Sequence, residues 1–302
     1  MIRIPRQQAG GLTNHKENTV HPSTAYSFEF FPPKTAEGMA NLRQVRQELA
    51  AFSPEFFSVT FGAGGSTRDR TMDSVLEIQA EGHGAAPHIS CISSSKADIR
   101  ELLSAYQAHG IKRLVTLRGD IPSGEVSAGD FKYASELVSF IRAETNDWFH
   151  IEVAAYPECH PESGSPARDL QHFKRKIDAG ANSAITQYFY NVDAYFRFVE
   201  SAQALGVTAP IIPGIMPIYN FTQLSRFSNV CGAEIPRWLR LRLEDYGDDL
   251  ASLLAFGVDV VTDLCARLID AGVDKMHFYT LNQAGIISQI IRQLPPTRVE
   301  LM

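Results

Sequence analysis

The sequence of 302 residues contains only four cysteines, and no two of them form a C-x-x-C pair. This spacing excludes a zinc ribbon and a thioredoxin-type redox motif. Isolated thiols are more typical of a reducing compartment than of a disulfide framework. The polar N-terminal segment also lacks the apolar core of a signal peptide. We therefore expect a cytoplasmic protein.

The chain also lacks a basic excess and a long apolar run. Its 28 Lys and Arg residues stand against 34 Asp and Glu residues, a net charge of −6. No basic surface is available for a nucleic-acid backbone, so that class of partner is not expected. The apolar stretch 250–269 is interrupted by Asp259, Asp263 and Arg267. A membrane span is therefore not expected either.

What the sequence does contain is a regular alternation of short apolar runs and longer amphipathic stretches. The runs predict strands over 26–31, 56–61, 85–90, 113–117, 149–154, 183–187, 209–213 and 275–278. The amphipathic stretches predict helices over 37–51, 69–81, 96–109, 133–144, 168–179, 193–205, 248–271 and 281–293. A glycine expected to cap the preceding helix stands before five of the strands, at Gly82, Gly110, Gly180, Gly206 and Gly272.

Repeated strand–helix units predict parallel strands joined by crossover helices. This number of units in this length favours a closed (β/α)8 TIM barrel, with an open doubly wound sheet as the alternative. No Pro/Gly/Ser-rich linker divides the chain, so we expect a flexible tail over 1–22 and a single domain over 23–302. Chemistry in such a barrel sits at the carboxyl ends of the strands.

The first predicted strand carries a carboxylate in an apolar setting, Glu29 within FEFFPP at 28–33. Desolvation is expected to raise the pKa of this carboxyl, which would make it a candidate general acid. A buried glutamate paired with Lys34 or Arg118 explains the same residues equally well.

The second strand runs into the glycine-rich segment VTFGAGGST at 59–67. The segment matches neither G-x-G-x-x-G nor a P-loop. Its glycines permit close approach of the backbone to a flat or anionic ligand, and a tight βα turn is an equal alternative. The third strand contributes a lone histidine, His88, which is more typical of a core residue, and we expect no metal site.

Polar and aromatic side chains follow the later strands. Arg118 suits a phosphate or a polarised ring carbonyl, and Asp120 suits a ring N–H or a developing cation. Tyr156 and His160 suit stacking on a large ligand, while Gln187 offers both a donor and an acceptor to a heterocycle. The strand ends therefore predict a large, planar, partly anionic ligand at the barrel mouth. They do not by themselves name the reaction.

Seven motifs in order resemble the methylenetetrahydrofolate reductase family, in particular its bacterial members with a single catalytic domain. They are FEFFPP (28–33), VTFGAGGST (59–67), LRGD (117–120), AAYPE (154–158), KRKIDAGA (174–181), TQYF (186–189) and FYTLN (278–282). The resemblance implies an FAD-binding (β/α)8 barrel that reduces 5,10-methylenetetrahydrofolate to 5-methyltetrahydrofolate with NAD(P)H. It also implies ping-pong hydride transfer, a supply of methyl groups for methionine synthesis, and a homo-oligomer.

Residue roles follow from the same resemblance. Glu29 is expected to be the general acid that opens the folate ring, and Asp120 to lie between flavin and folate. Gln187, Phe221, Tyr279 and Gln283 are expected to contact the substrates. The expected FAD residues are Thr60, Phe61, Ala63, His88, Arg118, Gly119, Asp120, Ala134, Tyr156, His160, Ser163, Asp169, Arg175 and Lys176.

The chain departs from the family pattern at two positions. Gln283 stands where arginine is common, which removes a charge from the contact to the folate tail or the nicotinamide dinucleotide. His172 stands where asparagine is common. Three other classes fit parts of the sequence: a proline dehydrogenase-like flavin barrel, a metal-dependent barrel lyase or aldolase, and a non-enzymatic binding barrel.

Overall fold

The computed structural model describes residues 24–61, 65–119 and 129–295. The expected tail over 1–22 lies outside this part of the chain. In the described part, parallel strands form one sheet in the order β7-β6-β5-β4-β3-β2-β1-β9-β8. Their bounds are β1 Ala25–Phe30, β2 Phe56–Val59, β3 Ala85–Ser90, β4 Arg113–Leu117, β5 His150–Ala155, β6 Ser183–Thr186, β7 Ile211–Ile212, β8 Gly214–Ile215 and β9 Lys275–Tyr279.

The two shortest strands are halves of one barrel strand that is interrupted at Pro213. β7 pairs with β6, and β8 pairs with β9, so this split strand joins the two ends of the sheet. Proline has no N–H to donate to the ladder, which breaks the strand at that residue. The carbonyl of Pro213 still accepts from the backbone N–H of His277 at 3.0 Å. The sheet thus has eight strand positions around a ring, and the predicted (β/α)8 barrel is confirmed.

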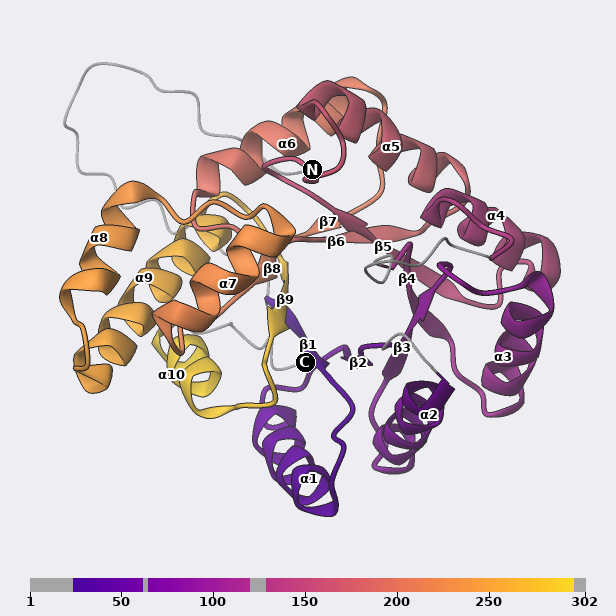
Figure 1. Ribbon diagram of the computed structural model, residues 1–302, viewed down its shortest axis with the longest axis horizontal. Coiled ribbons are helices and arrows are strands. Elements are labelled where there is room, and N and C mark those ends of the chain that lie inside the picture. Colours follow the sequence, from indigo (N-terminus) through magenta and orange to yellow (C-terminus); the bar gives the residue numbers. More distant parts are fainter. Residues whose placement is uncertain (1–23, 62–64, 120–128, 296–302) are drawn as a thin grey trace, which may run out of the picture.

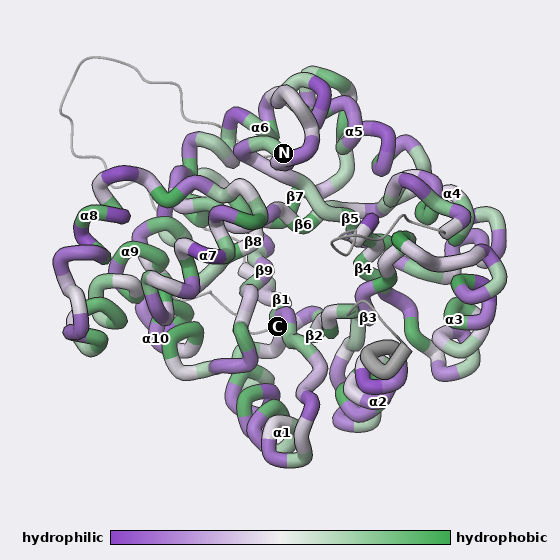
Figure 2. Tube along the Cα trace, viewed as in Figure 1, coloured by the Kyte–Doolittle hydropathy of each residue, from purple (hydrophilic) through white to green (hydrophobic). Residues whose placement is uncertain are grey.

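Helices surround the strands on the outside (Figure 1). They are α1 Ala36–Ala50, α2 Gly65–Ala80, α3 Lys96–Ala108, α4 Ala134–Thr145, α5 Pro166–Asp178, α6 Val192–Ala204, α7 Phe221–Cys231, α8 Arg237–Asp245, α9 Leu250–Asp270 and α10 Gly285–Gln293. Hydrophobic and hydrophilic residues alternate along these helices, as expected where one face packs on a sheet (Figure 2). No helix in the described part is long and apolar enough to cross a membrane.

The strands bury two separate sets of side chains, because alternate residues point to opposite faces. Phe28, Phe57 and Phe278 belong to the large cluster that also contains the helix residues Leu42 and Leu49. A small second cluster fills the barrel interior and consists of Phe56, Ala86, Val115, Ile185 and Ile212. On β1, the alternate residues Ser27 and Glu29 therefore face the interior.

The helix pattern differs from the prediction mainly after the split strand. α7 and α8 were not predicted; α7 begins at Phe221 and α8 at Arg237. The last helix begins at Gly285 rather than at 281, because Leu281 and Asn282 have positive φ values of 50° and 56° that no helix accommodates. The five predicted capping glycines all have positive φ, from 74° at Gly110 to 111° at Gly180.

Candidate functional site

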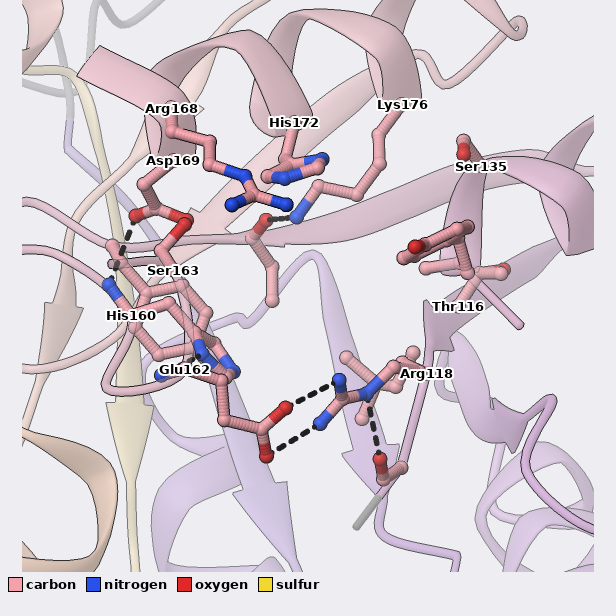
Figure 3. A pocket seen from close by; sticks show the side chains of 16 residues that line it. Thr116, Arg118, Ser135, His160, Glu162, Ser163, Arg168, Asp169, His172 and Lys176 are labelled. Carbon is pink, nitrogen blue, oxygen red and sulfur yellow. Dashed lines mark hydrogen bonds and ion pairs between the residues drawn. The ribbon is translucent and has the colours of Figure 1, made fainter. Parts of the chain in front are cut away.

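A cavity of about 450 Å³ opens beside the carboxyl ends of β4 and β5 (Figure 3). Its walls come from the end of β4, the start of α4, the segment after β5, and α5. It is lined by Thr116, Leu117, Arg118, Gly119, Tyr133, Ala134, Ser135, Ala154, Tyr156, His160, Glu162, Ser163, Arg168, Asp169, His172 and Lys176.

Three cationic side chains line this cavity: Arg118, Arg168 and Lys176. Arg118 donates to both carboxylate oxygens of Glu162, at 2.6 and 2.9 Å. The ammonium of Lys176 donates to the carbonyl of Ala154 at 2.5 Å, and burial lowers the pKa of Lys176 to about 8. The cavity therefore presents positive charge that an anionic ligand would neutralise.

Helix α5 sets which of its side chains reach the cavity. Ser165 caps the helix by accepting from the backbone N–H of Arg168 at 3.3 Å. Residues 168, 172 and 176 follow one another at intervals of four, so Arg168, His172 and Lys176 share one face. Arg175 lies on a different face and is exposed. Of the two basic residues predicted to contact FAD, the helix therefore directs Lys176 into the cavity and Arg175 away from it.

Asp169 organises the segment after β5. Its carboxylate accepts from the backbone N–H of His160 at 3.0 Å and from the hydroxyl of Ser163 at 3.1 Å. The ring of Tyr156 meets His160 edge-on with centroids 4.6 Å apart. Burial lowers the pKa of His160, so its imidazole is neutral near pH 7. This part of the cavity wall thus places two aromatic rings beside the Asp169 carboxylate.

A second group of polar residues surrounds Glu29, the penultimate residue of β1, at the carboxyl end of the barrel. Its Oε2 atom lies 3.4 Å from Nε2 of His88 and 3.8 Å from Nε2 of His277. Burial lowers the pKa of His88 to about 4, so this imidazole is neutral. The basic side chains near Glu29 are thus those of His88 and His277. Arg118, the alternative partner considered for Glu29, forms its ion pair with Glu162 instead.

The structure brings together only part of the predicted FAD set. The residues that line the cavity are Arg118, Gly119, Ala134, Tyr156, His160, Ser163, Asp169 and Lys176. Four others, Thr60, Phe61, His88 and Arg175, are not among its lining residues. Ala63 and Asp120 lie outside the described residues.

The predicted substrate residues follow strand ends at the same rim as Glu29, outside the cavity lining. Gln187 follows β6 and accepts through Oε1 from the backbone N–H of Tyr188 at 3.0 Å. Tyr279 ends β9 and donates its hydroxyl to the carbonyl of Thr186 at 2.7 Å. Half-buried Phe221 begins α7, and the carbonyl of Gln283 accepts from the hydroxyl of Tyr219 at 3.3 Å.

Sequence reasoning assigned no role to three prominent lining residues: Tyr133, Glu162 and Arg168. Tyr133 stacks on His172 with ring centroids 6.1 Å apart and planes at 20°. The spacing of four between residues 168 and 172 was the available signal for Arg168. Tyr133 and Glu162 gave no comparable signal, because their placement depends on the course of loops.

The residues of the cavity fit a ligand with an anionic part and flat rings. Arg118, Arg168 and Lys176 supply the positive charge, and the Tyr133–His172 pair supplies an aromatic surface. Such a donor set suits the pyrophosphate and rings of a dinucleotide such as FAD. Within the described ranges, no group of three His, Cys, Asp or Glu side chains is placed to hold a metal ion.

Comparison with known proteins shows similarity to a single enzyme family over most of the chain. A family model described as "Methylenetetrahydrofolate reductase" matches residues 14–295. The 5,10-methylenetetrahydrofolate reductases of Salmonella typhimurium and Escherichia coli are each 42% identical over 269 residues, covering 89% of this chain and 90% of theirs. A probable NADH-dependent methylenetetrahydrofolate reductase of rice is 37% identical over 91% of this chain, which spans 51% of that protein.

A solved structure of an uncharacterized Clostridium thermocellum protein that binds two copies of 5-methyl-5,6,7,8-tetrahydrofolic acid has the same fold. Its TM-score is 0.65 at 17% identity, over 90% of this chain and 94% of that one. At this identity the likeness concerns the fold alone. The match over 14–295 and the bacterial relatives establish that the chain belongs to the methylenetetrahydrofolate reductase family.

Proposed function

We propose that the protein catalyses the FAD-dependent reduction of 5,10-methylenetetrahydrofolate to 5-methyltetrahydrofolate with NAD(P)H, and so supplies methyl groups for methionine synthesis. One observation carries this proposal. In a chain of this family, Glu29 stands at the carboxyl rim of the barrel, and a cavity at the same rim combines three cations with aromatic rings. This rim is where barrels of this kind place their chemistry.

The cavity residues would hold FAD. Arg118 and Lys176 would neutralise its pyrophosphate, with Arg168 beside them on the shared face of α5. Tyr133 and His172 would offer their stacked rings to an aromatic part of the cofactor. When bound, FAD supplies a redox ring that takes a hydride from NAD(P)H and later gives it to the folate. Use of one site by both substrates in turn would give ping-pong kinetics.

The protein's own contribution to folate reduction would centre on Glu29. Its carboxyl would hold a proton and deliver it to the folate amine as the five-membered ring opens to the iminium. Neutral His88 lies beside this carboxyl, with its Nε2 3.4 Å from Oε2 of Glu29. Asp120, outside the described residues, would support the developing cation from the loop after β4.

The neighbouring strand ends would bind the pterin. The bond from the backbone N–H of Tyr188 fixes the amide of Gln187, which preorganises it to hydrogen-bond a heterocycle. Phe221, at the first turn of α7, would stack on either substrate. Tyr279 would form part of the floor beside Glu29, its register partner on β1.

The proposal is tested by following the product. Purified protein supplied with FAD, NADH and 5,10-methylenetetrahydrofolate is expected to form one 5-methyltetrahydrofolate, identified by mass spectrometry, for each NADH consumed. Oxidation of NADH without any methylated folate, under conditions in which the Escherichia coli relative forms it, would contradict the proposal.

A further inference from the structure

The barrel interior behind Glu29 holds a histidine that the proposed function does not use. His277 on β9 and Ser27 on β1 are register partners, and both are buried. The Ser27 hydroxyl lies 2.7 Å from Nδ1 of His277. Ser27 lies two residues before Glu29 on β1, and its side chain faces the barrel interior on the same side as that of Glu29. The contact therefore links β1 to β9 directly behind Glu29.

The other ring nitrogen of His277 has no such contact. Among the described residues, the buried Nε2 atom has no hydrogen-bond partner. A buried polar atom without a partner is costly, so an unpaired one calls for an explanation. Nε2 points to the side of Glu29, whose Oε2 lies 3.8 Å away. An approach of about 1 Å would bring the two atoms within hydrogen-bond distance.

The ring of His277 is buried among aromatic rings, whereas the carboxyl of Glu29 is partly exposed. The imidazole stacks on Phe56 with centroids 5.9 Å apart, and it meets the ring of Tyr279 at 87°. His277 is 0% exposed, while the side chain of Glu29 keeps 21% of its surface accessible. The approach of Nε2 and Oε2 would therefore come from Glu29.

We propose that His277, oriented by Ser27, is a positioning residue for Glu29. In this arrangement Nε2 carries the ring proton and donates it to Oε2 of Glu29, while the bare Nδ1 accepts from the Ser27 hydroxyl. The acidic proton of Glu29 is then confined to Oε1, the oxygen left to face the folate. No proton leaves His277 in this arrangement. The inference deepens the proposed function and rests on it.

His88 does not take this part. Its Nε2 atom also lies near Oε2, at 3.4 Å, and also lacks a hydrogen-bond partner among the described residues. What singles out His277 is its register partner Ser27, whose hydroxyl lies 2.7 Å from Nδ1. The tautomer of a histidine is set by the bond that its other nitrogen makes.

Two substitutions of His277 distinguish the role of its Nδ1 atom from that of its Nε2 atom. The amide nitrogen of asparagine occupies the place of Nδ1, and that of glutamine the place of Nε2. His277→Gln is expected to keep the rate of the folate half-reaction within about threefold of wild type, while His277→Asn lowers it by about tenfold to a hundredfold. Both should keep the rate of flavin reduction by NADH. A purely structural role predicts no such rescue by glutamine, and equal rates in the two variants would overturn the proposal.

A second readout needs neither flavin nor turnover. In the flavin-free wild-type protein, the ¹⁵N shifts of the His277 ring are expected to show a protonated Nε2 and a bare Nδ1. Ser27→Ala should mix the two tautomers. A ring protonated at Nδ1 in the wild type would overturn the proposal even if His277→Asn failed to fold. Absence of 5-methyltetrahydrofolate with wild-type enzyme would instead contradict the proposed function and leave the tautomer result unchanged.

Discussion

Arg118 and Glu162 form a two-point ion pair on the wall of the cavity, with nitrogen–oxygen distances of 2.6 and 2.9 Å (Figure 3). The carboxylate of Glu162 thus accepts the two N–H groups of Arg118 that an anionic ligand would use. If FAD binds here as proposed, Arg118 would have to exchange the carboxylate of Glu162 for the pyrophosphate, and this exchange would oppose binding.

We predict that Glu162→Gln tightens FAD binding by about two- to fivefold at low salt, since an exposed ion pair contributes up to about 1 kcal/mol. Titration of FAD fluorescence measures the affinity. Glu144→Gln is a matched control, because Glu144 makes a similar two-point pair with Arg100 outside the cavity lining. Weaker binding in Glu162→Gln, or an equal gain in the control, would contradict the prediction.

The affinity for FAD is predicted to depend on pH through Lys176. Burial lowers the pKa of Lys176 to about 8, and a bound pyrophosphate would favour the charged ammonium and raise it. The complex then holds a proton that the free protein has lost. Affinity should therefore be constant below about pH 8 and fall by up to about tenfold per pH unit above it.

Lys176→Met is predicted to bind FAD more weakly and to show no such decline above pH 8. Lys174→Met is the control, since Lys174 lies on the same helix but pairs with Asp178 away from the cavity. The control should keep the wild-type profile. An unaltered pH profile in Lys176→Met would show that another group titrates.

Stability is predicted to depend on Arg46, which is 1% exposed and pairs with Glu77 and Glu81 between α1 and α2. Arg46→Ala leaves both carboxylates without this cation and should lower the free energy of unfolding by about 3 kcal/mol. Arg43→Ala removes a 56% exposed partner of the same Glu77 and should lower the free energy of unfolding much less, because an exposed ion pair contributes little. Urea denaturation of both variants measures the difference, and equal losses would refute the prediction.

Glu29→Gln is predicted to separate the two half-reactions. The amide cannot donate an acidic proton, so re-oxidation of the reduced flavin by 5,10-methylenetetrahydrofolate should slow by at least about a hundredfold. Reduction of the flavin by NADH should stay within about twofold. Stopped-flow absorbance measures both rates. Glu55→Gln, at the amino end of the barrel beside Lys275, is the control. Equal loss of both half-reactions would refute the role of Glu29.

Much of the fold could be predicted because its signals are local. Apolar runs mark the strands, and a glycine before a strand marks the left-handed cap of the preceding helix, as at Gly110. The sequence did not predict α7 and α8, because few of their side chains are buried. In α7 the buried residues are Leu224 and Ser228, while α8 leaves Trp238 and Leu241 exposed. Neither helix has the broad apolar stripe of a helix that packs on a sheet.

The site could be predicted only in part, because it depends on how loops and helix faces are turned. The family resemblance implies that both Arg175 and Lys176 contact FAD, but the helical period places Lys176 in the cavity and leaves Arg175 exposed. The pair of Arg118 and Glu162 joins residues 44 apart, and Asp169 shapes the segment after β5 that carries Glu162. No local pattern encodes such a contact.

The most direct test of the account is the visible spectrum of the purified protein reconstituted with FAD under anaerobic conditions. The account predicts a bound flavin band that NADH or NADPH bleaches and 5,10-methylenetetrahydrofolate restores. A protein that binds no flavin under any reconstitution, or a reduced flavin that the folate leaves bleached, would contradict it.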